Sequence, residues 1–209
     1  MLYEYHATSV LKEALDDQLA NLYPDGVPTL RALKWLAKVD SDRIAGNDVM
    51  LSLMDIAAAK KLKVFLLGGS PDLLNIISNK LTTQRVLHEA YSPPFDPIEQ
   101  YDFNDQVTKI NSFNPDIILV GLGCPKQELW MHCMKDRVNA PMFGLGGAFA
   151  LFAGEDSRAP LWMRNLSLEW LYRLSLEPGR LWKRYMVTNS YFIFLFLREF
   201  WRVRIRGKQ

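Results

Sequence analysis

Three short apolar runs, each followed by a glycine-rich turn, constrain the fold of this chain most strongly. The runs and their turns are KVFLL (63–67) with Gly68 and Gly69, DIILV (116–120) with Gly121 and Gly123, and PMFGL (141–145) with Gly146 and Gly147. Continuous apolar runs of this length are typical of strands buried in a parallel sheet. The helical patterns that follow the turns indicate strand–turn–helix units joined by right-handed crossovers.

The spacing between these runs predicts the rest of the domain. A helix is expected from Pro71, and further helices are expected over about 98–112 and from Pro125 to about Lys135. A weaker strand is expected at 85–91. We therefore predict a Rossmann-like α/β domain over residues 1–155, with a mostly parallel sheet and helices on both of its faces.

After the third run the pattern changes to helices alone. We expect one helix from Trp162 to Leu176 and a second from Arg180 to Val187. The Thr-Asn-Ser sequence at 188–190 resembles an N-cap and predicts a third helix that runs to about Arg204. Residues 156–209 are therefore predicted to form a helical appendage.

The predicted appendage is basic and aromatic. The whole chain has a net charge of +2, but residues 158–209 carry eleven Arg and Lys against three Glu, a net charge of +8, and hold four of the six Trp. The apolar run YFIFLFL has seven residues, whereas a membrane span needs roughly 20. This mixture favours a helix lying in the membrane interface, with a helix packed on the core as the alternative. Nucleic acid is not an expected partner, because the segment is strongly apolar and no nucleic-acid motif accompanies it.

The glycine turns indicate where a ligand would bind. In open α/β sheets, ligands lie beyond the carboxyl ends of the strands, and glycine lets the backbone approach a phosphate closely. Three such turns in phase favour a nucleotide site, although each alone could be an ordinary tight turn. Lys126 and Gln127 follow Pro125 in the first turn of a predicted helix. There Lys126 could neutralise a phosphate and Gln127 could hydrogen-bond a base or sugar, with a solvated first turn as the alternative.

Two polar motifs lie upstream of the sheet. Asp25 in YPDG (23–26) precedes a predicted helix, which fits either a common turn or a general base. Arg43 in RIAGND (43–48) could bind a diphosphate through two hydrogen bonds, with Asn47 as a further substrate-binding residue. The alternative is a surface turn in which Asn47 or Asp48 caps a helix.

Neither a metal nor a cofactor is expected. Asp40 and Asp42 match the short Asp-x-Asp motif of metal-dependent sugar-nucleotide enzymes, but they follow a charged helix end instead of a buried strand. The three His residues form no cluster in the sequence. Cys124 and Cys133 lack metal-ligand spacing and no signal peptide is evident, so we expect a reduced cytoplasmic setting.

Seven motifs in this chain resemble those of the WecG/TagA/CpsF family, glycosyltransferase family 26. They occur in family order from about Tyr23 to Arg198 and are YPDG (23–26), RIAGNDVM (43–50), VFLLGGSP (64–71), VGLGCPKQE (120–128), GLGGAFALFAG (144–154), RAPLWMRNLSLEWLYRL (158–174) and EPGRLWKRY (177–185). The last three motifs are long and specific.

The resemblance implies a metal-independent, inverting transferase. Such an enzyme passes N-acetylmannosamine, its uronic acid or another hexose from a UDP-sugar to an undecaprenyl-diphosphate-linked sugar at the inner face of the cell membrane. Asp25 matches the proposed catalytic base, and Arg43 and Gln127 match pocket positions. The appendage is expected to touch the membrane and to stabilise the leaving diphosphate through three arginines, which are Arg173, Arg180 and Arg184.

One departure from the family pattern is expected to matter. Family members begin with a strand that carries a Thr-x-Asn element, and that element does not precede Asp25 here. A truncated, catalytically impaired member is therefore one alternative. A nucleotide-binding oxidoreductase is another, although its Gly-x-Gly-x-x-Gly fingerprint is not present. The sequence leaves the donor sugar, the acceptor glycan and the oligomeric state open.

Overall fold

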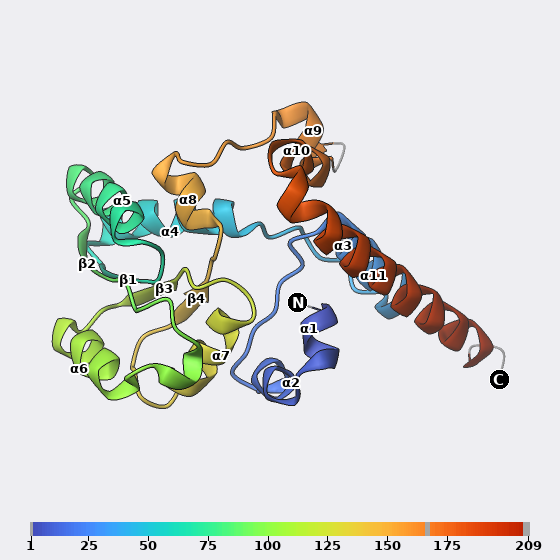
Figure 1. The fold of residues 1–209 in the computed structure, drawn as a ribbon, viewed down its shortest axis with the longest axis horizontal. Helices are drawn as coiled ribbons and strands as arrows, with labels where there is room; N and C mark the ends of the chain where they lie inside the picture. Colours follow the sequence, from blue (N-terminus) through green and yellow to red (C-terminus); the bar gives the residue numbers. More distant parts are fainter. Residues whose placement is uncertain (1, 166–167, 207–209) are drawn as a thin grey trace. The chain divides into compact units, whose positions relative to one another are not determined.

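A computed structural model describes residues 2–165 and 168–206 of the chain (Figure 1). Within these ranges, the following side chains are not described: Leu2, Tyr3, Ala7, Asn165, Arg180, Arg184 and Arg206. The chain divides into two compact units. The sheet unit comprises residues 9–21 and 45–157, and the helical unit comprises residues 1–8, 22–44 and 158–209. The predicted domain boundary at residue 155 stays a proposal.

Four parallel strands in the order β2-β1-β3-β4 form the sheet. They are β1 (Lys63–Leu67), β2 (Leu87–Tyr91), β3 (Ile117–Val120) and β4 (Met142–Gly144). The register pairs Val64 with Ile117 and Leu119 with Phe143. All three strand pairs are parallel, so each helical connection must return the chain to the end of the sheet where the next strand begins.

Alternate residues of the strands enter two separate cores, one on each face of the sheet. Val64 and Leu66 pack with α4 (Gly46–Lys60), α5 (Pro71–Thr83) and α8 (Ala148–Ala153). Phe65 and Leu67 pack with α6 (Phe103–Phe113) and α7 (Lys126–Met134). Figure 1 shows these two helical layers above and below the strands. The Rossmann-like α/β prediction, with helices on both faces, is confirmed.

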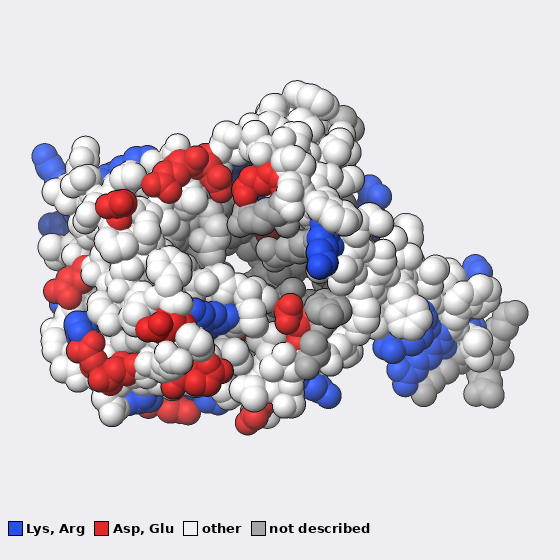
Figure 2. Space-filling view, in the orientation of Figure 1, with Lys and Arg blue, Asp and Glu red and all other residues white. Residues whose placement is uncertain are grey.

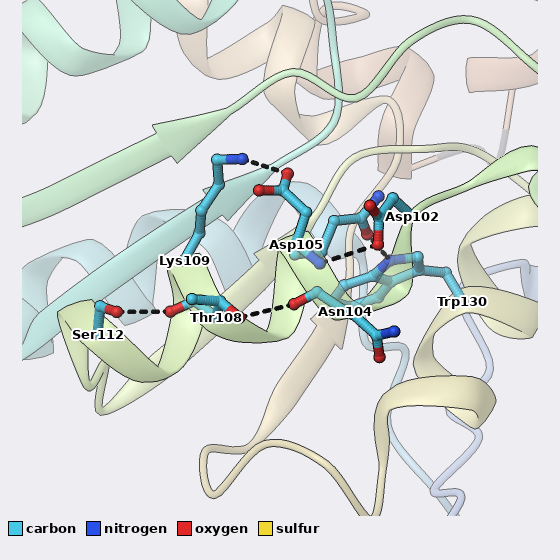
Figure 3. A network of polar contacts seen from close by, with 8 residues as sticks. Asp102, Asn104, Asp105, Thr108, Lys109, Ser112 and Trp130 are labelled. Carbon is cyan, nitrogen blue, oxygen red and sulfur yellow. Dashed lines mark hydrogen bonds and ion pairs between the residues drawn. The ribbon is translucent and has the colours of Figure 1, made fainter.

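The start of α6 shows why one predicted boundary was wrong. A helix was expected from residue 98, but η2 (Ile98–Gln100) is a single 3₁₀ turn and α6 begins at Phe103. Asp102 caps α6, because its Oδ1 accepts a hydrogen bond from the Asp105 amide at 3.0 Å (Figure 3). Lys109 pairs with Asp105 one turn later.

Helix α2 (Ser9–Asp16) packs on α7 within the sheet unit. Three apolar side chains of this short helix are buried, which are Leu11, Ala14 and Leu15. Asp17 follows them and pairs with Lys135, with His132 Nδ1 at 3.6 Å from the same carboxylate oxygen. The hydrogen bond from Lys135 holds the pKa of Asp17 below its usual value. These contacts fix the N-terminal segment 9–17 to the outer side of α7.

The helical unit contains the remaining helices. They are α1 (Leu2–Ala7), α3 (Val27–Ala32), the π-helical η1 (Leu33–Ala37), α9 (Leu161–Asn165), α10 (Glu169–Leu176) and α11 (Pro178–Arg206). Aromatic contacts join them: Tyr185 of α11 meets Trp170 of α10 at 6.2 Å between ring centroids. Further along α11, Tyr191 meets His6 at 5.9 Å and Phe196 meets Trp35 at 6.0 Å.

Two predicted helix boundaries in this unit were wrong. Helix α11 is continuous through 188–190, where an N-cap was expected, and the helix expected from Trp162 to Leu176 is two helices, α9 and α10. Thr, Asn and Ser disfavour a helix interior by only a few tenths of a kcal/mol each. Ring contacts of Tyr185 and Tyr191 flank this polar triplet, and tertiary packing of this kind stabilises a helix more than local propensity does. Among the described helices, none combines the length and apolarity needed to cross a membrane.

Candidate functional site

The three predicted glycine turns lie side by side at the carboxyl edge of the sheet. The Gly68 amide donates to the Tyr91 carbonyl at 3.0 Å, and the Gly121 amide donates to the Leu67 carbonyl at 2.7 Å. Beyond β4, the Leu145 amide donates to the Val120 carbonyl at 2.9 Å. The ladder of the sheet therefore continues into the turns and holds their backbones together.

Two of these glycines are required by packing. Gly68 has φ +99°, and a Cβ there would lie 2.7 Å from the Gly121 carbonyl carbon. A Cβ on Gly121 would lie 2.7 Å from the ring of Phe149. Neighbouring protein thus fills the space in front of both residues. Gly69 has φ +87°, and a Cβ there would lie 3.1 Å from Leu73 Cδ2, so the backbone conformation and a close side chain both favour glycine.

Other glycines face open space. Apart from the adjacent residues in the chain, no heavy atom of the described residues lies within 4 Å of a Cβ built on Gly123 or Gly147. Gly146 differs, because it has φ +42° and a Cβ there would lie 3.5 Å from Gln127 Oε1 and 3.9 Å from the Gly123 Cα. The turns after β3 and β4 therefore offer bare backbone at the edge where α/β proteins bind their ligands.

Lys126 and Gln127 do lie in the first turn of α7, as predicted, but both side chains have protein partners. Lys126 Nζ donates to the Asp96 carbonyl at 2.7 Å and lies over the ring of Tyr101. Gln127 is buried, and its Oε1 accepts from the Gly146 amide at 3.1 Å. Its Nε2 donates to Glu128 at 2.8 Å. Gln127 therefore belongs to the framework of the glycine turns.

The first turn of α4 lies next to the turn that follows β4. A Cβ on Gly46 would lie 3.8 Å from the Leu145 carbonyl oxygen. Asn47 is the next residue and is half-buried. The N-cap of α4 is Ala45, so the alternative in which Asn47 or Asp48 caps the helix was wrong. Both residues instead lie inside the first turn.

A cluster of two carboxylates and two arginines forms in the helical unit. Arg43 Nε donates to the Asp25 carbonyl at 2.7 Å, and its Nη2 donates to Glu169 at 2.9 Å. The same Nη2 lies 3.7 Å from the Asp25 carboxylate. Arg173 Nη2 approaches the other oxygen of Glu169 at 4.0 Å. Three predicted site residues, Asp25, Arg43 and Arg173, are thus brought together.

The carboxylate of Asp25 has an electrostatic setting that suits proton transfer. Partial withdrawal from water raises its pKa, and repulsion by Glu169 raises it further, while Arg43 and Arg173 act in the opposite direction. Its side chain remains 70% exposed, so water weakens each of these effects. Arg43 also holds the backbone of the turn that carries this carboxylate. Asp25 is therefore an accessible carboxylate on a fixed backbone.

Sequence reasoning missed Glu169, which joins Arg43 to Arg173. A Glu in the first turn of a helix stabilises the helix dipole, so Glu169 matches the usual pattern at the start of a helix and does not indicate a site. Its partner Arg43 lies 126 residues away in the chain. Its position inside the motif RAPLWMRNLSLEWLYRL was the available signal.

Other predicted positions contribute less. The side chains of Arg180 and Arg184 lie outside the described residues. Asp40 of the Asp-x-Asp motif pairs with Lys34 at 2.9 Å. Within residues 2–165 and 168–206, no three His, Cys, Asp or Glu side chains gather in a way that could hold a metal ion. Cys124 and Cys133 are free thiols in this part of the chain.

The parallel sheet with helices on both faces defines a Rossmann-like α/β protein, and its second unit carries a carboxylate–arginine cluster. Residues 1–206 match the glycosyl transferase WecG/TagA/CpsF family, and the chain belongs to that family. The family resemblance predicted from the sequence is confirmed, and the oxidoreductase alternative is set aside.

A named relative is similar over most of the chain. It is an N-acetylglucosaminyldiphosphoundecaprenol N-acetyl-beta-D-mannosaminyltransferase of Bacillus subtilis (strain 168), 34% identical over 173 residues. The matched region covers 81% of this chain and 66% of the relative. The chain therefore spans about two thirds of the length of that relative.

Proposed function

We propose that the protein transfers a hexose, of the N-acetylmannosamine type, from a UDP-sugar to a sugar linked to a polyprenyl diphosphate. Membership of a glycosyl transferase family supports the reaction class. The name of the Bacillus subtilis relative supports the acceptor and the transferred sugar.

Asp25 is proposed as the general base. The acceptor hydroxyl gives its proton to the Asp25 carboxylate while its oxygen attacks the anomeric carbon of the donor sugar. The bond from that carbon to the UDP oxygen breaks, and the configuration inverts. The observation that carries this proposal is the accessible Asp25 carboxylate, with a raised pKa, on a turn that Arg43 fixes.

The leaving UDP is proposed to gain its counter-charge from protein groups. Gly123 and Gly147 offer open backbone to the donor diphosphate in the sheet unit. Arg173, 48% exposed, is a candidate to stabilise the departing charge, together with Arg180 and Arg184. In the sheet unit, Asn47 and Lys126 are also proposed to bind the donor, and Gln127 is proposed to hold the glycine turns in place. We propose that no metal takes part in the reaction.

The long helix α11 is proposed to bind the inner face of the cell membrane peripherally. Large apolar side chains on it are exposed, among them Trp182, Phe194 and Trp201. Figure 2 shows basic side chains gathered near its C-terminal end, where Arg198, Arg202 and Arg204 lie. Exposed aromatic and basic residues on one helix are typical of attachment to an anionic membrane surface.

Replacement of Asp25 tests the proposed reaction. Asp25→Asn should lower turnover about 100- to 10,000-fold in an assay of UDP release from a UDP-hexosamine with a synthetic lipid-diphosphate acceptor. The fold should be unaffected, because a carboxyl whose pKa is raised on folding gives no stability above that pKa. The variant should therefore unfold at pH 7 at the wild-type temperature or slightly above it. Turnover above about a tenth of the wild-type value would rule out this role for Asp25.

A further inference from the structure

Glu128 is a buried carboxylate at the start of α7 that the proposed chemistry does not use. The residue is only 5% exposed. Its Oε1 accepts a hydrogen bond from Gln127 Nε2 at 2.8 Å, and its Oε2 is shielded from water and makes no geometrically good hydrogen bond among the described residues. The Cys124 thiol lies nearby, and burial and the Glu128 carboxylate both raise its pKa. A carboxylate in such a place is unfavourable for folding, which points to a functional reason for it.

The partner of Glu128, Gln127, contacts both open glycine turns. Its backbone amide donates to the Gly123 carbonyl at 2.8 Å, and its Oε1 accepts from the Gly146 amide at 3.1 Å. The side chain also packs closely against β4, because a Cβ on Gly144 would be 2.8 Å from Gln127 Nε2. Gln127 therefore ties the turn after β3 to the turn after β4.

Glu128 determines which way the Gln127 amide points. The two ends of an amide are nearly identical in shape, but one donates and the other accepts. A carboxylate can only accept, and the Gly146 amide can only donate. If the amide were reversed, its NH₂ group would face the Gly146 N–H and its oxygen would face the Glu128 carboxylate. Neither hydrogen bond could then form. One orientation alone satisfies both neighbours.

We infer that Glu128 is a positioning residue for nucleotide binding. It fixes the Gln127 amide, and Gln127 in turn fixes the turns whose open backbone at Gly123 and Gly147 receives the donor diphosphate. Gln127 acts through these turns and does not need to touch the donor itself. This inference rests on the nucleotide site proposed above.

Three variants separate this role from a structural one. Glu128→Met removes the acceptor at similar side-chain length, and UDP should bind about tenfold more weakly by calorimetry, as for one lost buried hydrogen bond. Gln127→Glu places two carboxylates together and should weaken binding at least as much. The exchanged pair Gln127→Glu/Glu128→Gln restores both hydrogen bonds and should regain most of the affinity.

Gln106→Met is the matched control. Gln106 is also buried in the sheet unit and accepts a bond from Trp130 Nε1 at 2.6 Å, but it lies in the α6–α7 core. This variant should lower the unfolding temperature and leave UDP affinity unchanged. Glu128→Met should weaken UDP binding and leave the unfolding temperature nearly unchanged. Replacing a poorly paired buried charge with an apolar side chain is often neutral for the stability of the fold.

Hydrogen exchange of the ligand-free protein provides a second measurement. The peptide that contains the Gly146 amide should exchange about tenfold faster in Glu128→Met, in line with one weakened hydrogen bond, and at nearly the wild-type rate in the exchanged pair. Wild-type affinity and exchange in Glu128→Met would overturn the inference, as would an exchanged pair that binds as weakly as Gln127→Glu. If the wild-type protein fails to bind UDP, the proposed donor is wrong, while the exchange rates still confirm or contradict the coupling of Glu128 to the turn.

Discussion

Arg43 shows how one side chain can position the proposed base, Asp25, and affect its charge state. It holds the backbone of Asp25 with its Nε and pairs with Glu169 through Nη2. Because Glu169 neutralises part of its charge, Arg43 does not fully suppress the proton affinity of Asp25. The balance among these neighbours, more than any single one, determines when Asp25 can act as a base.

That balance predicts opposite effects of two substitutions on pH dependence. Glu169→Gln removes a negative charge that raises the pKa of Asp25, so the acid limb of the pH profile of kcat/KM should move to lower pH. Arg173→Gln removes a positive charge that lowers this pKa, so the acid limb should move to higher pH. Each profile is obtained from UDP release between pH 4 and about 8. Shifts in the same direction would contradict the electrostatic account.

At the scale of elements, substitutions in the glycine turns should distinguish positions that stabilise the fold from positions proposed to bind the ligand. Gly68→Ala would force a Cβ into the Gly121 backbone at φ +99° and should destabilise the fold by about 2–4 kcal/mol. Gly147→Ala has open space and an ordinary φ of −65°, so its stability should change by less than about 0.5 kcal/mol. Thermal unfolding measures both effects.

Binding should rank the two substitutions differently. If the backbone at Gly147 approaches the donor diphosphate, its new methyl group should weaken UDP binding measurably while the fold stays intact. Unchanged UDP affinity of Gly147→Ala would show that this turn faces solvent alone and would remove Gly147 from the proposed site.

The same elements show what a sequence can and cannot specify. The strand at 63–67 could be predicted to the residue, because a fully buried strand is an uninterrupted apolar run between turns. The polar triplet 188–190 predicts an N-cap and not a helix interior, because the ring contacts that flank it involve residues elsewhere in the chain. Asp25 and Arg43 could be singled out from their motifs, whereas the motif around Glu169 gave no sign of its pairing with Arg43, 126 residues away in the chain.

At the scale of the whole molecule, the distribution of charge predicts salt-sensitive membrane attachment. Replacing Arg198, Arg202 and Arg204 with Gln should weaken binding to anionic vesicles by about 1 kcal/mol for each arginine, and added salt should weaken binding of the wild-type protein. A flotation assay measures the bound fraction. The apolar side chains of α11 should keep some binding in the variant.

A matched control removes the same charge elsewhere. Lys60, Lys61 and Arg85 are exposed on the sheet unit, so replacing all three with Gln lowers the net charge equally without touching α11. This protein should float as the wild type does. If both triple variants lose binding to the same extent, net charge and not the basic end of α11 accounts for the attachment.

The path of the chain between its two units limits how this protein can be recombined. The chain passes from one unit to the other four times, at 8/9, 21/22, 44/45 and 157/158. A chimaera joined at residue 155 would therefore import a new Glu169 and α11 while keeping the old Arg43, His6 and Trp35 that contact them. The C-terminal helices therefore cannot be exchanged between relatives as an independent cassette. Substitutions in 22–44 and in 158–206 should instead be transferred together.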